Sequence, residues 1–125
     1  DCLSPVVAFR VSPETRGMIG KRELSLLKPG SYLINTSRGG IVDEDALFRV
    51  LSAGGIAGAA MDVFVVEPPP ADHPLLTLRN FVATPHVAGA TVEAMRRMAT
   101  DLAEEVLRVL RGERPLYPVN PEVYR

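Results

Sequence analysis

Apolar and polar positions follow one another along this chain in blocks that predict strands and helices in turn. Four short apolar runs predict β-strands over residues 6–11, 31–35, 56–64 and 81–84. Apolar residues at helical spacing predict helices over residues 21–27, 44–52 and 92–111, and a short helix is expected to start near a turn at residues 12–15. Because strands alternate with helices, we expect an α/β fold with right-handed crossovers and a mainly parallel sheet that helices cover.

Capping residues and glycines mark where the helices begin and end. Asp43 and Thr91 each precede a helical pattern, and their side-chain oxygens are suited to accept hydrogen bonds from the first free backbone amides. Glycines at residues 54–55 end the second helix, and Gly112 caps the last one. Residues 113–125 contain three prolines, so we expect a tail that packs as extended chain or is loose.

The stretch at residues 32–44 organises the rest of the chain. It begins as an apolar strand, passes through glycines at residues 39–40 and ends with two acids that open a helix. Arg38 lies at the turn, where open α/β sheets bind their ligands. A guanidinium there can grip a carboxylate through two parallel hydrogen bonds, although Arg38 alone is more simply explained as a surface residue.

Other polar side chains follow the next two strands. Asp62 lies near the end of the third strand, Glu67 lies in the loop behind it, and His86 follows the fourth strand. Since parallel strands share one carboxyl edge, we expect these residues and Arg38 to converge on one rim. A histidine that exchanges protons near neutral pH, an arginine and a carboxylate together suit a substrate whose own carboxylate lies beside a carbonyl or hydroxyl.

These residues also have simpler interpretations. His86 fits a loop residue at a strand end, Glu67 fits a solvated loop acid, and His73 fits a turn residue. Asp62 is harder to dismiss, because its strand is expected to be buried on both faces. A buried carboxylate is costly unless it is hydrogen-bonded or paired.

Size, charge and cysteine content narrow the possible functions. The 125 residues suffice for one domain, and 14 basic against 15 acidic residues argue against nucleic acid and anionic membranes as partners. No apolar run reaches the length of about 18 residues that a membrane span needs. The single cysteine, Cys2, excludes an intramolecular disulfide and favours a reducing compartment, so we expect the cytoplasm. No cysteine–histidine spacing suits a metal, and no Gly-x-Gly-x-x-Gly fingerprint of a dinucleotide fold occurs.

Four segments, in order and at family spacing, resemble the D-isomer-specific 2-hydroxyacid dehydrogenases, especially the branch of glyoxylate/hydroxypyruvate reductases and phosphoglycerate dehydrogenases. The segments are residues 12–20, 27–44, 57–64 with Glu67 and Pro68, and 84–89. The resemblance implies the C-terminal half of a Rossmann-type doubly wound parallel sheet in a three-layer α/β/α arrangement. That half of the dinucleotide-binding domain would be residues 1–90, and residues 91–125 would be a long helix and tail leading back to a substrate domain. The chain begins without Met, so we expect a piece of a longer protein.

The resemblance also implies an activity and the residues that carry it. The protein would be an oxidoreductase that transfers a hydride between NAD or NADP and a small 2-oxo or 2-hydroxy acid, such as glyoxylate or hydroxypyruvate. Arg38 would bind the carboxylate and carbonyl of the substrate, His86 would be the general acid and base, and Glu67 would pair with His86. The residues at the nicotinamide side of the cofactor would be Thr36, Ser37, Arg38, Asp62, His86 and Gly89.

Further expectations concern the cofactor, the assembly and the alternatives. Asp62 would hold the carboxamide of the nicotinamide, which gives the buried acid a reason to exist. The complete protein would be a homodimer with no nucleic-acid or membrane partner. The family often has His-x-Pro where residues 8–10 read Ala-Phe-Arg, a difference that bears on cofactor contacts. Two other functions stay open: a non-catalytic cofactor-sensing or assembly module on the same fold, and an inactive fragment that needs its missing half.

Overall fold

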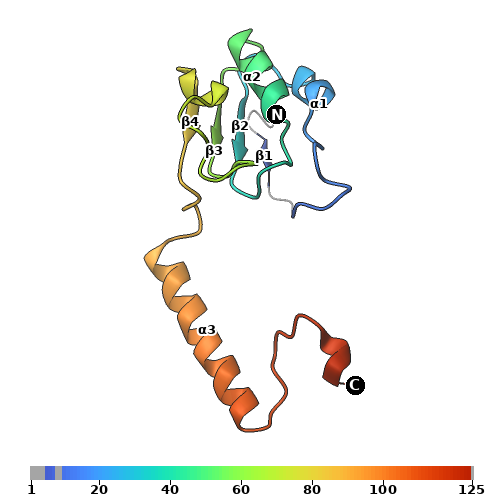
Figure 1. Cartoon of the computed structure of the whole chain (residues 1–125), viewed down its shortest axis with the longest axis vertical. Coiled ribbons are helices and arrows are strands. Elements are labelled where there is room, and N and C mark those ends of the chain that lie inside the picture. The colour runs from blue at the N-terminus through green and yellow to red at the C-terminus, as the bar shows by residue number, and fades with distance from the viewer. Residues whose placement is uncertain (1–4, 8–9, 125) are drawn as a thin grey trace. The chain divides into compact units, whose positions relative to one another are not determined.

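The computed structural model describes residues 5–7 and 10–124, and the chain divides into two compact units after Ala88. The first unit contains a parallel sheet with helices, and the second is built around one long helix (Figure 1). Cys2 and the residues at positions 8 and 9, which the sequence singled out, lie outside the described ranges.

Four parallel strands form one sheet in the order β1-β2-β3-β4, which confirms the parallel arrangement that the alternating pattern predicts. The strands are β1 (Val6–Val7), β2 (Tyr32–Asn35), β3 (Gly58–Met61) and β4 (Phe81–Ala83) (Figure 1). β1 and β3 are shorter than the apolar runs at residues 6–11 and 56–64. β3 ends where its neighbour does: the amide of Asp62 donates to the carbonyl of Asn35 at 3.0 Å, and β2 then turns away.

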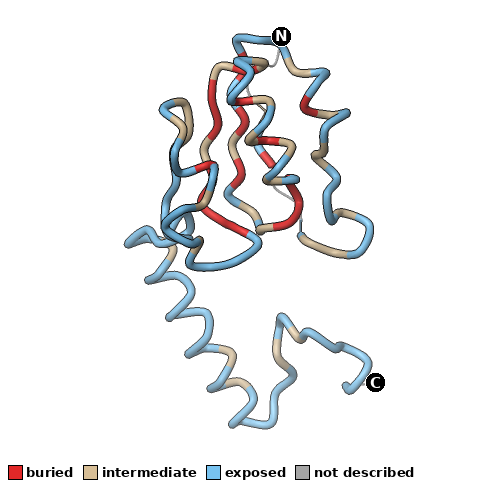
Figure 2. Tube along the Cα trace, turned by 45° about the horizontal axis from the view of Figure 1, so that its top comes forward, coloured by how far each residue is buried: buried red, intermediate tan, exposed pale blue. Residues whose placement is uncertain are grey.

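The helices of the first unit pack on one face of this sheet. They are α1 (Lys21–Ser25), α2 (Glu44–Ser52) and the 3₁₀-helix η1 (Pro74–Thr77). Their buried leucines and the inward residues of the strands form one hydrophobic core, which includes Leu24, Leu33, Leu47, Leu51, Ala59, Met61 and Leu75. Burial of one leucine side chain contributes about 1.5–3 kcal/mol, so this core, red in Figure 2, holds the helices to the sheet.

Local hydrogen bonds decide where the first unit forms helices. The side chain of Asp43 caps α2 by accepting from the amide of Ala46 at 2.9 Å, as predicted. The pattern predicts only a connector at residues 75–80, whereas Pro74 begins η1, because its fixed φ suits the first turn of a helix. The short helix expected near residues 12–15 is wrong, because Ser12 and Thr15 bond to each other within a turn.

The opposite face of the sheet is open in the first unit. Val6, Ile34 and Val82 lie in register on this face, and Tyr32 shares it. Val6 is 61% exposed, Tyr32 54% and Val82 61%. Within the described residues of the first unit, no helix covers these side chains, so the unit supplies two of the three expected layers.

The second unit begins at Gly89 and contains α3 (Val92–Leu110) and the 3₁₀-helix η2 (Pro121–Tyr124). Thr91 caps α3 as predicted, since its side chain accepts from the amide of Ala94 at 3.1 Å. Arg111 takes the C-cap position expected for Gly112, and Gly112 follows it at a φ of +76°.

The proline-rich tail packs on α3, as the first of the two expected alternatives has it, but it is not extended throughout. It ends in η2, and the amides of Leu116 and Tyr117 donate to the carboxylate of Glu105 at 2.8 and 3.3 Å. Hydrogen bonds therefore fold the tail back onto α3. Among the residues that the structure describes, neither α3 nor any shorter helix combines the length and the hydrophobicity that a membrane crossing requires.

Candidate functional site

One buried asparagine builds the turn after β2. The Oδ1 atom of Asn35 accepts from the amide of Ser37 at 3.1 Å and from its hydroxyl at 2.7 Å, and the Nδ2 atom donates to the carbonyl of Arg38 at 3.2 Å. Such side-chain bonds to nearby backbone stabilise turns. The turn leaves the side chain of Arg38 exposed at the carboxyl edge of the sheet, where its Nη1 atom donates to the Ser37 carbonyl at 2.7 Å.

Glu67 and His86 come from two different loops and form a pair. The Oε2 atom of Glu67 and the Nδ1 atom of His86 are 2.8 Å apart. The Oε1 atom of Glu67 accepts from the amide of Phe64 at 2.9 Å, so both oxygens of the carboxylate are engaged. Because Glu67 binds Nδ1, the other ring nitrogen, Nε2, is the atom that can face a substrate.

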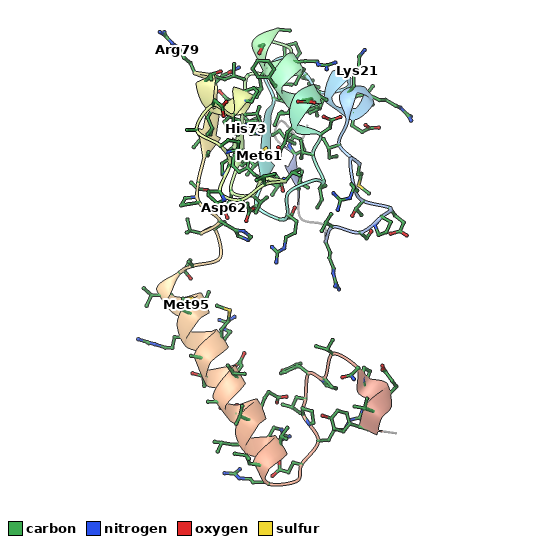
Figure 3. The ribbon with its side chains drawn as sticks, viewed as in Figure 1. Lys21, Met61, Asp62, His73, Arg79 and Met95 are labelled. Carbon is green, nitrogen blue, oxygen red and sulfur yellow. The ribbon has the colours of Figure 1, made fainter. Side chains whose placement is uncertain are left out.

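Asp62, labelled in Figure 3, is buried, and its carboxylate holds the turn after β4. Its Oδ1 atom accepts from the hydroxyl of Thr84 and from the amide of Val87, and its Oδ2 atom accepts from the amide of Ala88. These donors satisfy the buried charge. His86 lies inside this turn with a φ of +56°, so Asp62 helps to fix the backbone from which the imidazole projects.

Both carboxyl groups are held in the ionised form. Burial pushes the pKa of Asp62 upward, but the hydrogen bonds from Thr84 and from two backbone amides, with the charge of His86, outweigh it and keep the pKa below its ordinary value. The hydrogen bond from His86 is the largest cause that lowers the pKa of Glu67, and a backbone amide and the charges of His86 and Arg38 act in the same direction. Both carboxylates are therefore ionised at neutral pH, and that of Glu67 is hydrogen-bonded to the imidazole of His86.

A pocket of about 300 Å³ opens between the loops that follow β3 and β4. Asp62, Glu67 and His86 contribute to its lining, as do Phe64 and Thr84. Arg38 is outside this lining, but its charge acts on Glu67. The structure thus brings together Asp62, Glu67 and His86, the predicted residues that follow β3 and β4, and places Arg38 within electrostatic reach of Glu67.

The remaining predicted cofactor residues differ in their surroundings. Thr36 is exposed and Ser37 is half-buried, and both flank Arg38 in the turn after β2. Gly89 is the first residue of the second unit and is described with it. Within the described ranges, no three His, Cys, Asp or Glu side chains gather in a way that would hold a metal ion.

Sequence reasoning missed three residues that support this rim. Glu44 accepts from the amide of Val65 at 2.8 Å and pairs with His73 at 3.2 Å, although His73 is expected only as a turn residue. Gly39 packs against the Phe64–Val65 peptide so closely that a Cβ atom there would lie 1.9 Å from the Phe64 carbonyl oxygen. An acid at a helix start and a glycine in a turn are ordinary local signals, and these contacts join residues more than 20 positions apart.

Comparison with known proteins identifies the class to which this fold and rim belong. The family model of the D-isomer specific 2-hydroxyacid dehydrogenase, NAD binding domain, matches residues 2–88. The chain belongs to this family, which confirms both the family resemblance and the expected Rossmann-type α/β fold.

Similar proteins are longer than this chain. A glyoxylate reductase from Thermofilum pendens is 46% identical over 98% of the chain, which spans 37% of that protein. A D-3-phosphoglycerate dehydrogenase from Methanocaldococcus jannaschii is 46% identical over 82% of the chain, which spans 20% of that protein. The chain therefore spans well under half the length of these curated relatives.

Solved structures of the family superpose closely on the chain. A D-isomer specific 2-hydroxyacid dehydrogenase from Lactobacillus delbrueckii ssp. bulgaricus, in its NAD complexed form, matches with a TM-score of 0.84 and 32% identity over 94% of this chain and 40% of that one. A D-isomer specific 2-hydroxyacid dehydrogenase from Xanthobacter autotrophicus Py2, in complex with NADPH and MES, matches with a TM-score of 0.79 and a sequence identity of 38%. The match covers 98% of this chain and 50% of that one.

Proposed function

We propose that this chain is part of an oxidoreductase that transfers a hydride between NAD or NADP and a small 2-oxo or 2-hydroxy acid, such as glyoxylate or hydroxypyruvate. The observation that carries the proposal is the pair of Glu67 and His86, 2.8 Å apart and within electrostatic reach of Arg38. Family membership supports it, as do relatives named glyoxylate reductase and family structures with NAD or NADPH bound. The nicotinamide supplies or accepts the hydride, and the side chains supply binding and proton transfer.

His86 serves as the proton donor and acceptor. With Nδ1 bound to Glu67, the Nε2 atom gives a proton to the carbonyl oxygen of the substrate during reduction and takes one from the hydroxyl during oxidation. The carboxylate of Glu67 orients the ring and stabilises its charged form. Arg38 binds the carboxylate of the 2-oxo acid through two parallel hydrogen bonds, and this contact holds the carbonyl of the substrate so that it faces the imidazole of His86.

The cofactor residues predicted from the resemblance are Thr36, Ser37, Arg38, Asp62, His86 and Gly89, and Asp62 offers a test of fit. A carboxylate has about four acceptor positions, and Thr84, Val87 and Ala88 occupy three of those on Asp62. One acceptor position is left, and it suits the amide hydrogen of a nicotinamide carboxamide.

The direct test is an assay of the full-length protein with NADH or NADPH and with glyoxylate or hydroxypyruvate. His86→Ala removes the proton donor, so we expect kcat to fall about 10²–10⁴-fold. Near wild-type turnover by this variant would contradict the role of His86. A wild-type protein that binds cofactor but turns over no 2-oxo acid would instead favour the non-catalytic module.

Arg38 has a matched control at the other end of the sheet. Arg79 is exposed and lies just before β4, far from Asp62 (Figure 3). Arg38→Gln removes the bidentate partner of the substrate carboxylate, so we expect KM for the 2-oxo acid to rise about tenfold or more. Arg79→Gln should leave KM unchanged, and equal effects of the two variants would refute the role of Arg38.

We also propose how the complete protein is organised. Residues 1–90 form the C-terminal half of a dinucleotide-binding domain, and residues 91–125 form a long helix and tail that lead back to a substrate domain. The protein forms a homodimer. It works in the cytoplasm, and the single cysteine supports this reducing compartment. Light scattering of the full-length protein tests the dimer, and cell fractionation tests the compartment.

A further inference from the structure

The loop that carries Glu67 is fixed by a carboxylate on a different element. This loop, residues 64–73, follows β3, and its Val65 amide donates to the Oε1 atom of Glu44 at 2.8 Å. Glu44 is the first residue of α2. The preceding amide, that of Phe64, donates to Glu67 itself at 2.9 Å. The successive amides of Phe64 and Val65 thus donate to two carboxylates, that of Glu67 in the site pocket and that of Glu44 outside its lining.

The far end of the same loop returns to the same carboxylate. The Nε2 atom of His73 lies 3.2 Å from the Oε2 atom of Glu44, and the side chains of His73 and Glu44 are each only 15% exposed. The Nδ1 atom of His73 is buried and has no hydrogen-bond partner among the described residues. We therefore assign the Nε2–H tautomer, in which the proton points to Glu44 and Nδ1 carries only a lone pair.

Phe64, at the start of this loop, packs against two other aromatic rings. The ring of Phe64 meets the ring of His73 edge to face at a centroid distance of 5.4 Å, and meets that of Phe81, on β4, at 6.2 Å. Edge-to-face aromatic pairs contribute beyond their buried area. Gly39 lies directly against the Phe64–Val65 peptide, so the turn that carries Arg38 also packs against the start of this loop.

We propose that Glu44 and His73 are positioning residues of the reaction, which hold the loop at residues 64–73 so that Glu67 faces His86. Neither side chain belongs to the lining of the site pocket. Glu44 closes the loop from both ends, one oxygen at Val65 and the other at His73. The inference rests on the proposed function, because it assigns these residues a purpose in that site.

The test uses the full-length protein in the 2-oxo acid assay. Glu44→Ala frees both ends of the loop, so we expect kcat to fall about tenfold or more while KM for NADH stays within about twofold, since misplacement by a fraction of an ångström weakens the chemical step. Glu44→Gln keeps a carbonyl for the Val65 amide and should restore most of kcat. Asp45→Ala, an exposed acid in the same helical turn, is the matched control and should match wild type.

A second substitution keeps the test decisive if Glu44→Ala does not fold. His73→Phe preserves an aromatic ring beside Phe64 and removes only the bond to Glu44, so we expect kcat to fall about threefold. A double-mutant cycle then separates positioning from general damage. In a Glu67→Gln background, His73→Phe should cause no further loss of kcat, and neither should Glu44→Ala if it folds, because the residue that they position is already gone. Equal losses in both backgrounds would overturn the inference.

Hydrogen exchange distinguishes failure of this inference from failure of the proposed function. In Glu44→Ala, the amides of Phe64 and Val65 should exchange faster than in wild type, whether or not the protein reduces 2-oxo acids. Faster exchange in a protein without activity would retain Glu44 as the support of the loop and reject the proposed function. An active wild type whose Glu44→Ala variant keeps both its exchange rate and its kcat would reject the inference alone.

Discussion

His86 adopts a backbone conformation that its side chain disfavours. Its φ of +56° lies in the left-handed region, where a residue with a Cβ atom carries strain of about 1–3 kcal/mol. Surrounding hydrogen bonds hold it there: the His86 amide donates to the Thr84 carbonyl, and the next two amides donate to Asp62. The strain and its supports place an imidazole against Glu67, at the end of β4.

Asp62 should therefore contribute to stability as well as to function. In Asp62→Asn, the amide group replaces one acceptor oxygen with a donor, so at least one donor from the turn loses its bond to the buried side chain at position 62. We expect the free energy of unfolding of this domain to fall by about 1–3 kcal/mol. Urea denaturation measures the change, with exposed Asp72→Asn as control. Equal midpoints for the two variants would contradict this account of the buried acid.

Glu67 should make stability depend on pH in the acid range. Its pKa is lowered first by the hydrogen bond from His86, then by the Phe64 amide and nearby positive charge. A carboxyl group with a lowered folded-state pKa stabilises the fold above its unfolded-state pKa, and this contribution is lost as pH falls through the folded-state pKa. The Tm of wild type should therefore exceed that of Glu67→Gln at neutral pH, and the difference should shrink on acidification.

Calorimetry of both proteins between neutral and acid pH measures this difference. Glu104→Gln, an exposed glutamate of α3, is the control and should show a gap in Tm that stays small at every pH. A gap for Glu67→Gln that widens as pH falls would reverse the sign of the argument and exclude a lowered pKa.

At the scale of elements, the rim is joined by contacts between loops. The turn after β2 carries Arg38, and the loop after β3 carries Glu67. These two segments meet where Gly39 faces the Phe64–Val65 peptide. A glycine is needed there for space, since any Cβ atom would overlap backbone atoms of Phe64 and Val65.

Gly39→Ala tests this close approach. The added Cβ atom would lie 1.9 Å from the Phe64 carbonyl oxygen, so the two segments must separate. We expect a loss of about 1–3 kcal/mol in the free energy of unfolding, together with reduced kcat in the full-length protein. Gly30→Ala is the matched control, because a Cβ atom there would meet nothing within 4 Å. Similar losses in both variants would mean that the contact at Gly39 has no special importance.

The difference between local signals and contacts between distant residues explains what the sequence predicts and what it does not. Periodicity and capping chemistry act within a few residues, so α2 and α3 begin at the caps expected from Asp43 and Thr91. The topology of a parallel sheet then predicts that Asp62 and His86 share one edge. The bonds of Glu44 to residues 21 and 29 positions away have no such local signal, and neither does the fold of the loop between them.

At the scale of the whole molecule, each of the two units exposes apolar side chains. The first unit leaves one face of its sheet open at Val6, Tyr32 and Val82. In the second unit, α3 carries an apolar stripe with each side chain at least half exposed, formed by Met95, Met98, Leu102, Val106 and Val109. The curated relatives are much longer than this chain. If α3 leads back to a substrate domain, as we propose, that domain can pack on the apolar stripe.

Leu102→Asp in the full-length protein tests whether that stripe is buried there. A leucine that is buried in the complete protein contributes about 1.5–3 kcal/mol, and a carboxylate at the same place adds the cost of an unpaired charge. We expect Tm to fall by several degrees, while Asp101→Asn on the neighbouring exposed position should leave Tm unchanged. If both variants have the same Tm as wild type, α3 is exposed to solvent in the complete protein and residues 91–125 form an independent element. If only Leu102→Asp melts early and its kcat also falls, α3 is packed in the complete protein and its packing is needed for full activity.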